Sequence, residues 1–494
     1  MKASATDDTY LSKSLFIRGL QCHKSLYLHK RHPELKDEVP PSRQALFASG
    51  IDIGTIAQGL FPGGLNIPYD PDNYERQVEM TREAIEKGIT TLYEASFQFG
   101  GVFVKADILH KGKDGWDIYE VKSSTSIKDV YIPDAAVQYY AVKGSGLPVS
   151  RVFLAHINNR YVREGDIEVD KLFAVNDVTC EVQQMQDAIE GEIDTQKTMI
   201  RGHIPRIDIG PYCHSPYECD FIGHCWKHIP DESVFNIKGS RAFPFTLYNR
   251  GIVHLKDIPA HMLSASQRLQ VEATLEKKIV ISKESIQDFL NSLRYPIYFL
   301  DFETFSSPVP LLNGTRPYQQ IPYQYSLHVL ESEGSKLTHH EYLALPGVDP
   351  RKELAAKLLS EIPEDACVVA YVASFEKGIL MSLAEYFPEF KTKIDRITEN
   401  MADLALPFQK RYLYHWRFNG SYSLKAVLPA LVPGLTYDNM EVRNGSMAMQ
   451  SYTEMQAIND RAEIERIREA LLEYCKLDTL AMVRIVEKLK EVAE

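Results

Sequence analysis

Apolar and polar residues alternate along two neighbouring segments, Gly101–Leu109 and Trp116–Ser123, and this alternation predicts two β-strands. The residues between them, Lys111–Gly115, are rich in glycine and predict a turn. A helical pattern follows at Asp134–Lys143, and a further strand pattern follows at Val149–Asn158. This order of strands and helix predicts an α/β domain built on a mixed sheet.

Helical spacing of apolar residues marks the chain on either side of these strands. Tyr10–His32 reads as a basic helix with Ser12 as its N-cap, and Gln44–Leu60 reads as a second helix. Phe173–Arg201 also has a helical pattern. The first part of the chain is therefore expected to combine one sheet with several helices.

A second set of strands and helices is predicted in the C-terminal part of the chain. Tyr295–Phe305 and Ala366–Tyr371 read as strands, and Ala470–Leu489 reads as a helix. Phe418–Pro433 reads as a turn that leads into a short helix. Between the two parts, residues 231–289 contain short helical pieces and are expected to connect them.

The composition is that of a soluble globular protein. A length of 494 residues suggests about three domains, and 44% hydrophobic with 25% charged residues is ordinary. No apolar run reaches membrane-spanning length, and the first residues lack the apolar core of a signal peptide. We therefore expect a cytoplasmic protein with no membrane partner. The net charge of −12 excludes an overall basic footprint, so nucleic acid would have to bind through local basic grooves and metal ions.

Three charged residues on the first two strands form a candidate metal site. Asp107 lies near the end of the first strand, and Glu120 and Lys122 lie two apart on the second, so both project from one face. Carboxylate oxygens suit Mg²⁺ or Mn²⁺, and a lysine can orient water or stabilise phosphate charge. A surface hairpin with ordinary charges is the alternative, since this pattern also occurs by chance.

The strand, turn, strand and helix pattern resembles the PD-(D/E)XK nucleases in their RecB-like branch. In that branch the helix after the E-x-K strand carries Gln and Tyr, which implies Gln138 with Tyr139 or Tyr140. The branch also has a metal-side His or Glu on an earlier helix, where this chain has Gln58. Because a neutral amide is a poor ligand, we expect Glu94 to supply the missing carboxylate.

Seven cysteines, odd in number and unevenly spaced, favour metal or cluster ligation over disulfides in a cytosolic chain. Cys213, Cys219 and Cys225 are spaced six apart, and Cys22 is the natural fourth ligand. Zinc or four unrelated thiols are the alternatives. The arrangement resembles the iron–sulfur RecB-like nucleases, including the CRISPR-associated ones, which implies a structural [4Fe–4S] cluster. The other three cysteines lie in apolar stretches and are expected to be small buried residues: Cys180, Cys367 and Cys475.

A second acidic constellation lies in the C-terminal part. One strand carries Asp301 and Glu303, and the last helix carries Tyr474 and Asp478 four apart on one face. This pairing resembles the DEDDy 3′–5′ exonucleases of the RNase H-like fold, whose acids hold two metal ions about 4 Å apart. In the family's middle motif this chain offers Glu376 where Asp is expected.

One further acid and one turn of the C-terminal part are additional candidates for this site. Asp403 is a further carboxylate candidate. Three residues in the turn before a short helix could contact a phosphate, although a helix cap also explains the second of them: Ser421, Ser423 and Lys425.

Over nearly its whole length the chain resembles a bacterial family of uncharacterised proteins that fuse a RecB-like iron–sulfur nuclease to an RNase H-like domain. The motifs YFLDFETF, SFEKGIL, GSYSLKAVLP and YCKLDTLAM carry this resemblance. It implies a restriction-endonuclease-like nuclease domain over 1–230, a helical connector over 231–292 and a three-layer RNase H-like domain over 293–494. Three residues of the connector faintly resemble a helix–hairpin–helix DNA binder, with a plain spacer as the alternative: Arg250, Gly251 and Lys256.

The resemblance implies a metal-dependent DNA nuclease that acts on single-stranded or frayed ends, with RNA left open as a substrate. Asp107 and Glu120 would bind Mg²⁺ or Mn²⁺, and Lys122 and Gln138 would support the phosphate and the attacking water. Two rivals come from other classes. One is a non-catalytic scaffold that binds nucleic acid, and the other is a phosphodiesterase acting on free nucleotides. Cleavage of labelled single strands and salt-dependent DNA affinity separate the three.

Overall fold

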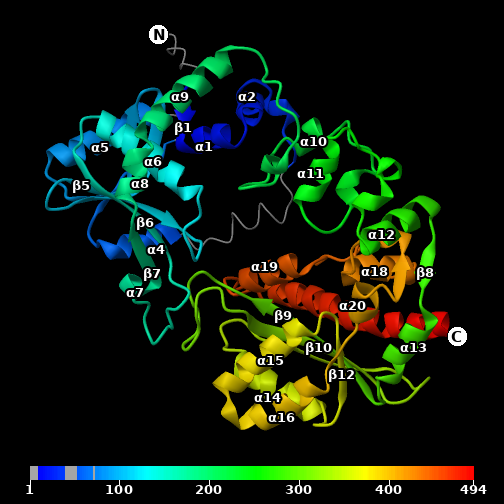
Figure 1. The fold of residues 1–494 in the computed structure, drawn as a ribbon. Helices are drawn as coiled ribbons and strands as arrows, with labels where there is room; N and C mark the ends of the chain where they lie inside the picture. The colour runs from blue at the N-terminus through cyan, green and yellow to red at the C-terminus, as the bar shows by residue number, and fades with distance from the viewer. Residues whose placement is uncertain (1–8, 39–52, 71–72) are drawn as a thin grey trace. The chain divides into compact units, whose positions relative to one another are not determined.

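The structure is a computed structural model that describes residues 9–38, 53–70 and 73–494 (Figure 1). The chain forms two compact units. The first holds the described residues before Ile229 together with Ser307–Gln319, and the second holds Ile229–Ser306 and Gln320–Glu494. The expected boundary at residue 230 therefore lies beside a boundary between units, and the expected connector is part of the second unit.

The first unit is built on a mixed sheet in the order β2-β3-β4-β5-β6-β7, with β1 paired in parallel beside the start of β4. β3, β4 and β5 are antiparallel, β5 and β6 are parallel, and β7 is antiparallel to β6. The predicted strands correspond to β4, β5 and β6. The bounds are β1 Leu11–Ser12, β2 Leu65–Asn66, β3 Thr91–Phe99, β4 Val102–Lys111, β5 Trp116–Lys122, β6 Val149–Ile157 and β7 Phe173–Asp177.

Helices cover both faces of this sheet. One face packs against α1, α5, α6, α8 and α9, and the other packs against α4 and α7. α6 lies on β3, β4 and β6 and is buried along most of its length. The bounds are α1 Lys13–Gln21, α2 His23–Arg31, α4 Ile53–Ala57, α5 Tyr74–Glu86, α6 Tyr131–Gly144, α7 Val169–Leu172, α8 Thr179–Gln184 and α9 Gln186–Arg201.

Two of the predicted helices are wrong in their extent. The predicted helix over Phe173–Arg201 begins with strand β7, because this short segment pairs with β6 and only the following residues turn helical. The predicted helix over Tyr10–His32 is two helices, since Cys22 between them has an extended backbone. Ser12 is the N-cap as predicted, and its hydroxyl accepts the backbone N–H of Leu15. Of the predicted helix over Gln44–Leu60, the part before Ile53 lies outside the described residues.

The second unit has a five-stranded sheet in the order β11-β10-β9-β12-β13. β9, β10 and β11 are antiparallel neighbours, and β12 and β13 run parallel to β9. Every residue of β10 is buried, which is typical of a strand covered on both faces. The bounds are β9 Ile297–Phe305, β10 Ile321–Leu330, β11 Thr338–Leu343, β12 Cys367–Ala370 and β13 Ala402–Asp403.

Helices sandwich this second sheet, and they form three layers with it (Figure 1). α14, α15 and α16 share a hydrophobic cluster on one face, while α13, α18, α19 and the long α20 share another with the opposite face. The bounds are α13 Lys283–Asn291, α14 Arg351–Glu361, α15 Ser374–Tyr386, α16 Lys391–Glu399, α18 Leu424–Leu431, α19 Gly445–Met455 and α20 Arg461–Ala493. The unit is thus an α/β/α arrangement around a mixed sheet.

The connecting residues carry a small core of their own around α11 and α12. Arg250 and Gly251 lie in the turn after α11, and Gly251 has a φ of +78°, a conformation that favours glycine. Lys256 lies in a single 3₁₀ turn. A two-stranded sheet of β8 and β14 joins this region to the rest of the second unit. The bounds are α11 Ala242–Tyr248, α12 Ala265–Glu276, β8 Ile279–Ile281 and β14 Leu413–His415.

Candidate metal centres and a cysteine cluster

The first site lies where β5 separates from β4. The register pairs Ile108 with Tyr119, so Asp107 and Glu120 occupy the next opposed positions on the two strands. The Asp107 Oδ2 atom accepts the backbone N–H of Val121 at 2.7 Å, which fixes the aspartate against the departing strand. The two predicted carboxylates therefore lie in the opening between the strands.

Glu120 is almost fully buried, and other predicted residues saturate its oxygens. The Lys122 ammonium donates to its Oε1 at 2.6 Å, and the Gln138 amide donates to its Oε2 at 2.5 Å. Gln138 is itself fully buried, and its Oε1 has no partner among the described residues. A buried acceptor without a donor is costly, so this oxygen is free to accept a hydrogen bond from a water molecule.

Two residues of this site were not predicted. Lys13, the first residue of α1, places its Nζ 2.8 Å from Glu120 Oε1 and 3.7 Å from Asp134 Oδ1. Asp134 also contacts Lys122. Asp134 could have been found, because it precedes Gln138 by four residues on the same face of α6. Lys13 carries no signal, since only the fold brings α1 against β5.

The charges of this cluster shift the pKa values of Asp107 and Glu120 in opposite directions. Burial and the charge of Glu120 raise the pKa of Asp107 to about 8. Burial would also raise the pKa of Glu120, but Lys13 and Lys122 outweigh it and hold that pKa well below its usual range. Burial would lower the pKa of both lysines, but the acids around them keep each pKa above its ordinary value. At neutral pH one carboxylate is therefore charged and the other holds a proton.

Glu94 lies opposite Asp107 on β3 and marks a strained position. Tyr93 pairs with Ile108 and Ala95 pairs with Ala106, while Glu94 between them has a left-handed φ of +57°. Such a conformation costs on the order of 1 kcal/mol or more and clusters at functional sites. The Glu94 carboxylate pairs with Lys105 at 2.5 Å, so a lysine already engages the predicted extra ligand.

The other residues of the RecB-like pattern lie apart from the acids. Gln58 is in a 3₁₀ segment, and its carbonyl accepts the Tyr93 hydroxyl at 3.3 Å. Tyr139 is buried, and Tyr140 packs against Phe99. The tyrosines that surround Lys122 come from elsewhere in the unit. The Lys122 ammonium lies 5.1 Å from the ring centre of Tyr131. The Tyr318 hydroxyl donates to the backbone carbonyl of Ser123, and the charge of Lys122 acts on the Tyr217 hydroxyl.

Lys13→Met should strengthen cation binding at the first site. The change removes the Lys13 ammonium, which now pairs with the Glu120 carboxylate and would repel a divalent ion. We expect the cation concentration for half-maximal binding to fall several-fold in calorimetric titrations with Mn²⁺. Lys24→Met on α2 is the control for the loss of one lysine, because Lys24 donates to the carbonyl of Ile207 instead. Weaker binding in Lys13→Met would contradict the competition between lysine and cation.

The four predicted cluster cysteines converge in the first unit. Cys22, Cys213, Cys219 and Cys225 line one cavity, together with aromatic and aliphatic side chains. The helix break at Cys22 points its thiol into this cavity, and the backbone N–H of Cys219 bonds the carbonyl of Cys213 at 2.9 Å. Four thiols in one half-buried cavity form a donor set that fits a metal or an iron–sulfur cluster.

The spacing of these thiols bears on the kind of metal. Tetrahedral zinc with bonds of about 2.3 Å holds its sulfurs about 3.8 Å apart. Among the described residues, no three of these thiols have their sulfur atoms within 4.8 Å of one another. A cluster with one thiolate on each of four irons needs a wider spread. The donor set itself suits zinc as well as an iron–sulfur cluster.

The remaining cysteines differ from one another. Cys367 is buried as predicted, but Cys180 is exposed, because it lies on the outer side of the first turn of α8. Cys475 is buried, yet its surroundings are polar rather than apolar. Its thiol lies 3.5 Å from the Asp301 carboxylate at the second site.

The second site lies between β9 and α20. Asp301 and Glu303 are two apart on β9, so they share one face of the strand, and Asp478 approaches from α20. Asp478 Oδ1 accepts the hydroxyl of Tyr437 at 2.5 Å. Tyr474 is nearly buried, and its hydroxyl hydrogen-bonds the Asp478 carboxylate. The predicted acids and tyrosine therefore meet, and Tyr437 is an addition that no sequence spacing indicated.

Glu376 and Lys425 complete the electrostatic environment of this site. Glu376 is buried in the first turn of α15, and its Oε2 has no partner among the described residues. Its charge is close enough to raise the pKa of Asp301 and of Glu303. Lys425 donates to the carbonyl of Arg443 at 2.9 Å, and its ammonium lies 5.4 Å from the ring centre of Tyr474. Four acids thus face one nearby cation.

The weaker candidates near this site have structural tasks. Asp403 Oδ1 accepts the backbone N–H groups of Val372 and Ala405, which holds the turn after β12. Ser423 occupies the N-cap position of α18, but its side chain makes no capping bond and lies 3.2 Å from the hydroxyl of Ser421. Two members of this group act on the acids of the site. Lys425 faces Asp478, Glu303 and Asp301, and the charge of Asp403 helps to raise the pKa of Glu376.

Burial raises the pKa of all four acids, and neighbouring acids raise it further for Asp301, Glu303 and Glu376. The pKa of Glu303 and that of Glu376 rise to about 8, that of Asp478 rises to about 6, and that of Asp301 lies well above its usual range. Ordinary values are 3.8 and 4.5, so between about pH 4 and pH 8 the native state binds more protons than the unfolded state. The free energy of unfolding should therefore fall as the pH rises through this window.

We expect the metal-free protein to melt at a lower temperature at about pH 8 than at about pH 6, because the second-site acids then lose their protons. Saturating Mn²⁺ should restore the melting temperature at the higher pH, since a cation replaces the lost protons. Differential scanning calorimetry with and without chelator measures both effects. A melting temperature that is insensitive to pH and to Mn²⁺ would contradict the close approach of these acids.

The comparisons with known proteins match parts of the chain. A family described as "Domain of unknown function (DUF2779)" matches residues 298–423, which run from β9 to the turn before α18. "Uncharacterized protein MG366 homolog" of Mycoplasma pneumoniae is 28% identical over 229 residues, which are 42% of this chain and 34% of the relative. "Uncharacterized protein MG366" of Mycoplasma genitalium is 28% identical over 214 residues, 40% of this chain and 32% of the relative. The match thus spans about a third of the length of these curated relatives.

The matched family covers part of the second site. Asp301, Glu303 and Glu376 lie inside the matched range, and Lys425 and Asp478 lie beyond it. Separately, within residues 9–38, 53–70 and 73–494, no helix has both the length and the apolar character needed to cross a membrane.

Proposed function

We propose that this chain is a metal-dependent nuclease with two separate centres for phosphodiester hydrolysis. One observation carries the proposal: Asp107 and Glu120 meet in the opening between β4 and β5, with Lys122 and Gln138 bonded to Glu120. A carboxylate pair with an adjacent lysine suits cation-assisted attack of water on a phosphate. Of the residues that the PD-(D/E)XK resemblance implies, these four support the proposal.

At the first centre the chain's own residues divide the work. Asp107 and Glu120 would hold Mg²⁺ or Mn²⁺, which when bound activates water and neutralises phosphate charge. Lys122 would leave Glu120 to face the scissile phosphate or the attacking water. Gln138 keeps the Glu120 carboxylate in its orientation, and its free Oε1 can accept a hydrogen bond from a bound water molecule.

The second centre supports an RNase H-like exonuclease of the DEDDy type. The support comes from a three-layer unit with two acids on the central strand β9 and a third on the final helix. Asp301, Glu303, Glu376 and Asp478 would hold the cations, and Tyr474 would orient the water. Lys425 stands near enough to stabilise phosphate charge.

The proposed substrate is single-stranded or frayed DNA, with RNA as the other candidate. Tyr217 and Tyr318 are exposed beside Lys122, and exposed aromatic rings stack on unpaired bases of any sequence. The test is cleavage of end-labelled single strands, duplexes and RNA with Mg²⁺ or Mn²⁺, and again with chelator. Cation-dependent cleavage of single strands supports the proposal. Salt-dependent binding without cleavage would favour the non-catalytic scaffold, and turnover of free nucleotides alone would favour the phosphodiesterase.

The cysteine cavity supports a structural [4Fe–4S] cluster in the first unit. We expect anaerobically purified protein to be brown, with a broad visible absorption that bleaches on reduction, and to contain iron and sulfide. Cys213→Ser should lose the colour and lower the melting temperature of the first unit, whereas Cys180→Ser, at an exposed cysteine, should change neither. A colourless protein with stoichiometric zinc would show that the thiols hold zinc.

A further inference from the structure

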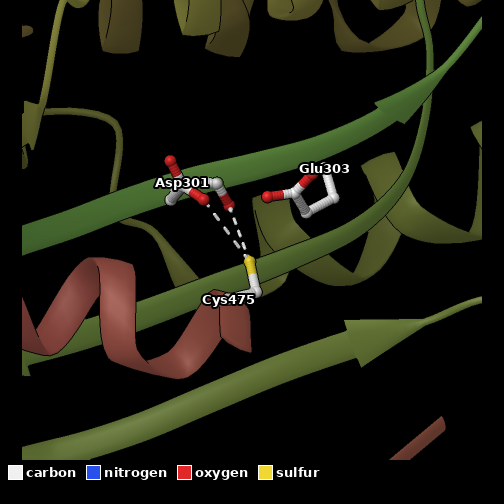
Figure 2. A group of neighbouring side chains, drawn as sticks. All are labelled: Asp301, Glu303 and Cys475. Carbon is white, nitrogen blue, oxygen red and sulfur yellow. Dashed lines mark hydrogen bonds between the residues drawn. The ribbon is translucent and has the colours of Figure 1, made fainter. Parts of the chain in front are cut away.

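The thiol of Cys475 lies inside the second acidic cluster. Its Sγ is 3.5 Å from Asp301 Oδ2, and single ligand atoms of Asp301, Glu303 and Cys475 all lie within 4.8 Å of one another (Figure 2). Figure 2 shows the sulfur of α20 directed toward the two acids of β9. Cys475 is fully buried and lies one turn before Asp478 on the same helix. This arrangement offers a cation one sulfur and several oxygens.

A second, independent observation indicates that a ligand is missing at this place. The hydroxyl of Tyr323 is fully buried and has no hydrogen-bond partner among the described residues. It is close enough to Glu303, Cys475 and Asp301 that their charges, added to burial, raise the pKa of Tyr323. Glu376 Oε2 is a second buried oxygen of this site without a partner in the described part of the chain. Native proteins rarely leave such groups unsatisfied, so a cation with its bound water would complete them.

The amino acid at this position has a chemical consequence. Mg²⁺ prefers oxygen ligands, whereas thiolate sulfur is a soft donor that favours the later and softer divalent metals. A thiol that binds a cation loses its proton to solvent, so one S–H bond is exchanged for one metal–sulfur bond. A serine here would keep a hydrogen-bond donor for Asp301 but would lack that preference.

We infer that Cys475 is a ligand of the cation held by Asp301 and Glu303, and that its sulfur directs this centre toward softer divalent ions. The inference rests on the proposed function of the second site, because it names an additional ligand of the same cation. It predicts that Co²⁺, Zn²⁺ or Cd²⁺ binds here in preference to Mg²⁺.

The experiment is a titration of the full-length, cluster-loaded protein with Cd²⁺, followed by thiolate-to-cadmium absorption in the ultraviolet. The wild type, Cys475→Ser and Cys367→Ser are compared. Cys367 is the matched control, since it is buried in the same unit on β12, away from the acids. The cluster cysteines are present in all three proteins and cancel in the differences.

We expect Cys475→Ser, but not Cys367→Ser, to lose the absorption of one thiolate. Its Cd²⁺ affinity should fall about tenfold or more, a loss typical of damage to a metal's ligand environment. Its Mg²⁺ affinity should change much less. Cys475→Ala repeats the test without a hydroxyl, and unfolding curves of the metal-free variants confirm that each is folded.

Two negative results have different meanings. If wild type and Cys475→Ser bind Cd²⁺ alike while Asp301→Asn abolishes binding at this site, the acids hold a cation but the sulfur does not, and the inference is overturned. If Asp301→Asn also binds Cd²⁺ like the wild type, no cation binds at these acids, and both the inference and the proposed second centre are overturned. The first centre would remain untouched by either result.

Discussion

Replacing Glu120 with glutamine should abolish cation-dependent cleavage by the first unit, with a loss of about a thousandfold or more. Glutamine has the same shape, so it fills the same buried place, but it lacks the charge that a cation requires. Glutamine is preferable to alanine, because its amide oxygen can still accept from Lys13 or Lys122, whereas alanine would leave both lysines beside an empty cavity. Cleavage of end-labelled single strands measures the effect.

Asp117→Asn provides a closely matched control. Asp117 lies on the same strand, is equally buried and also accepts from a basic side chain, since Arg151 donates to it at 2.9 Å. Both variants remove a buried carboxylate charge that pairs with a basic side chain. Only Glu120→Gln should lose cleavage. If Glu120→Gln and Lys122→Met, made as separate variants, both keep full cation-dependent cleavage, the reaction does not occur at the first site.

The first site shows what short-range periodicity can predict. Glu120 and Lys122 are two apart on one strand, so local spacing placed both on one face, whereas Gln138 on the next helix was implied by the RecB-like resemblance. Lys13 could not be predicted from the sequence, because more than one hundred residues separate it from Glu120. Its position at the start of a helix is not distinctive either, since α13 and α16 also begin with a lysine. Only the docking of α1 beside β4 gives it a role.

The helices show the opposite limit. Tyr10–His32 has continuous helical spacing, yet the chain is extended at Cys22, because the thiol must reach the cavity that it shares with three distant cysteines. Phe173–Asp177 lacks a turn signal before the helix that follows, so its pairing with β6 could not be distinguished from a first helical turn. In both cases tertiary partners decided the local structure.

Cys475 illustrates a different error. Its sequence neighbours on α20 include Leu471, Leu472 and Leu477, and in such a stretch a cysteine is normally a small apolar residue. Cys475, however, lies on the same buried face of α20 as Tyr474 and Asp478, and this face packs against β9. The acids of β9 are distant in the sequence, so no local pattern around Cys475 could indicate that its thiol lies beside them.

Asp301→Asn, made in the Glu120→Gln background, should abolish the remaining trimming of 3′ ends and yet stabilise the metal-free protein. The two centres differ in charge balance. At the first, two lysines face the acids, so the pKa of Glu120 is held low and removal of its charge costs stability. At the second, four acids face Lys425 as their one cationic neighbour among the described residues, so removing one acidic charge relieves repulsion in a buried place.

The expected signature of Asp301→Asn is therefore twofold and opposite in sign. The melting temperature of the chelator-treated variant should exceed that of its parent at about pH 8, and Mn²⁺ should no longer raise it. Asp349→Asn is the control, because Asp349 lies in the same unit and pairs with Arg351 outside the site. That change should leave trimming and the Mn²⁺ response as in the parent. Residual trimming that persists unchanged in Asp301→Asn, with the Mn²⁺ response intact, would show that the acids of β9 do not form a working centre.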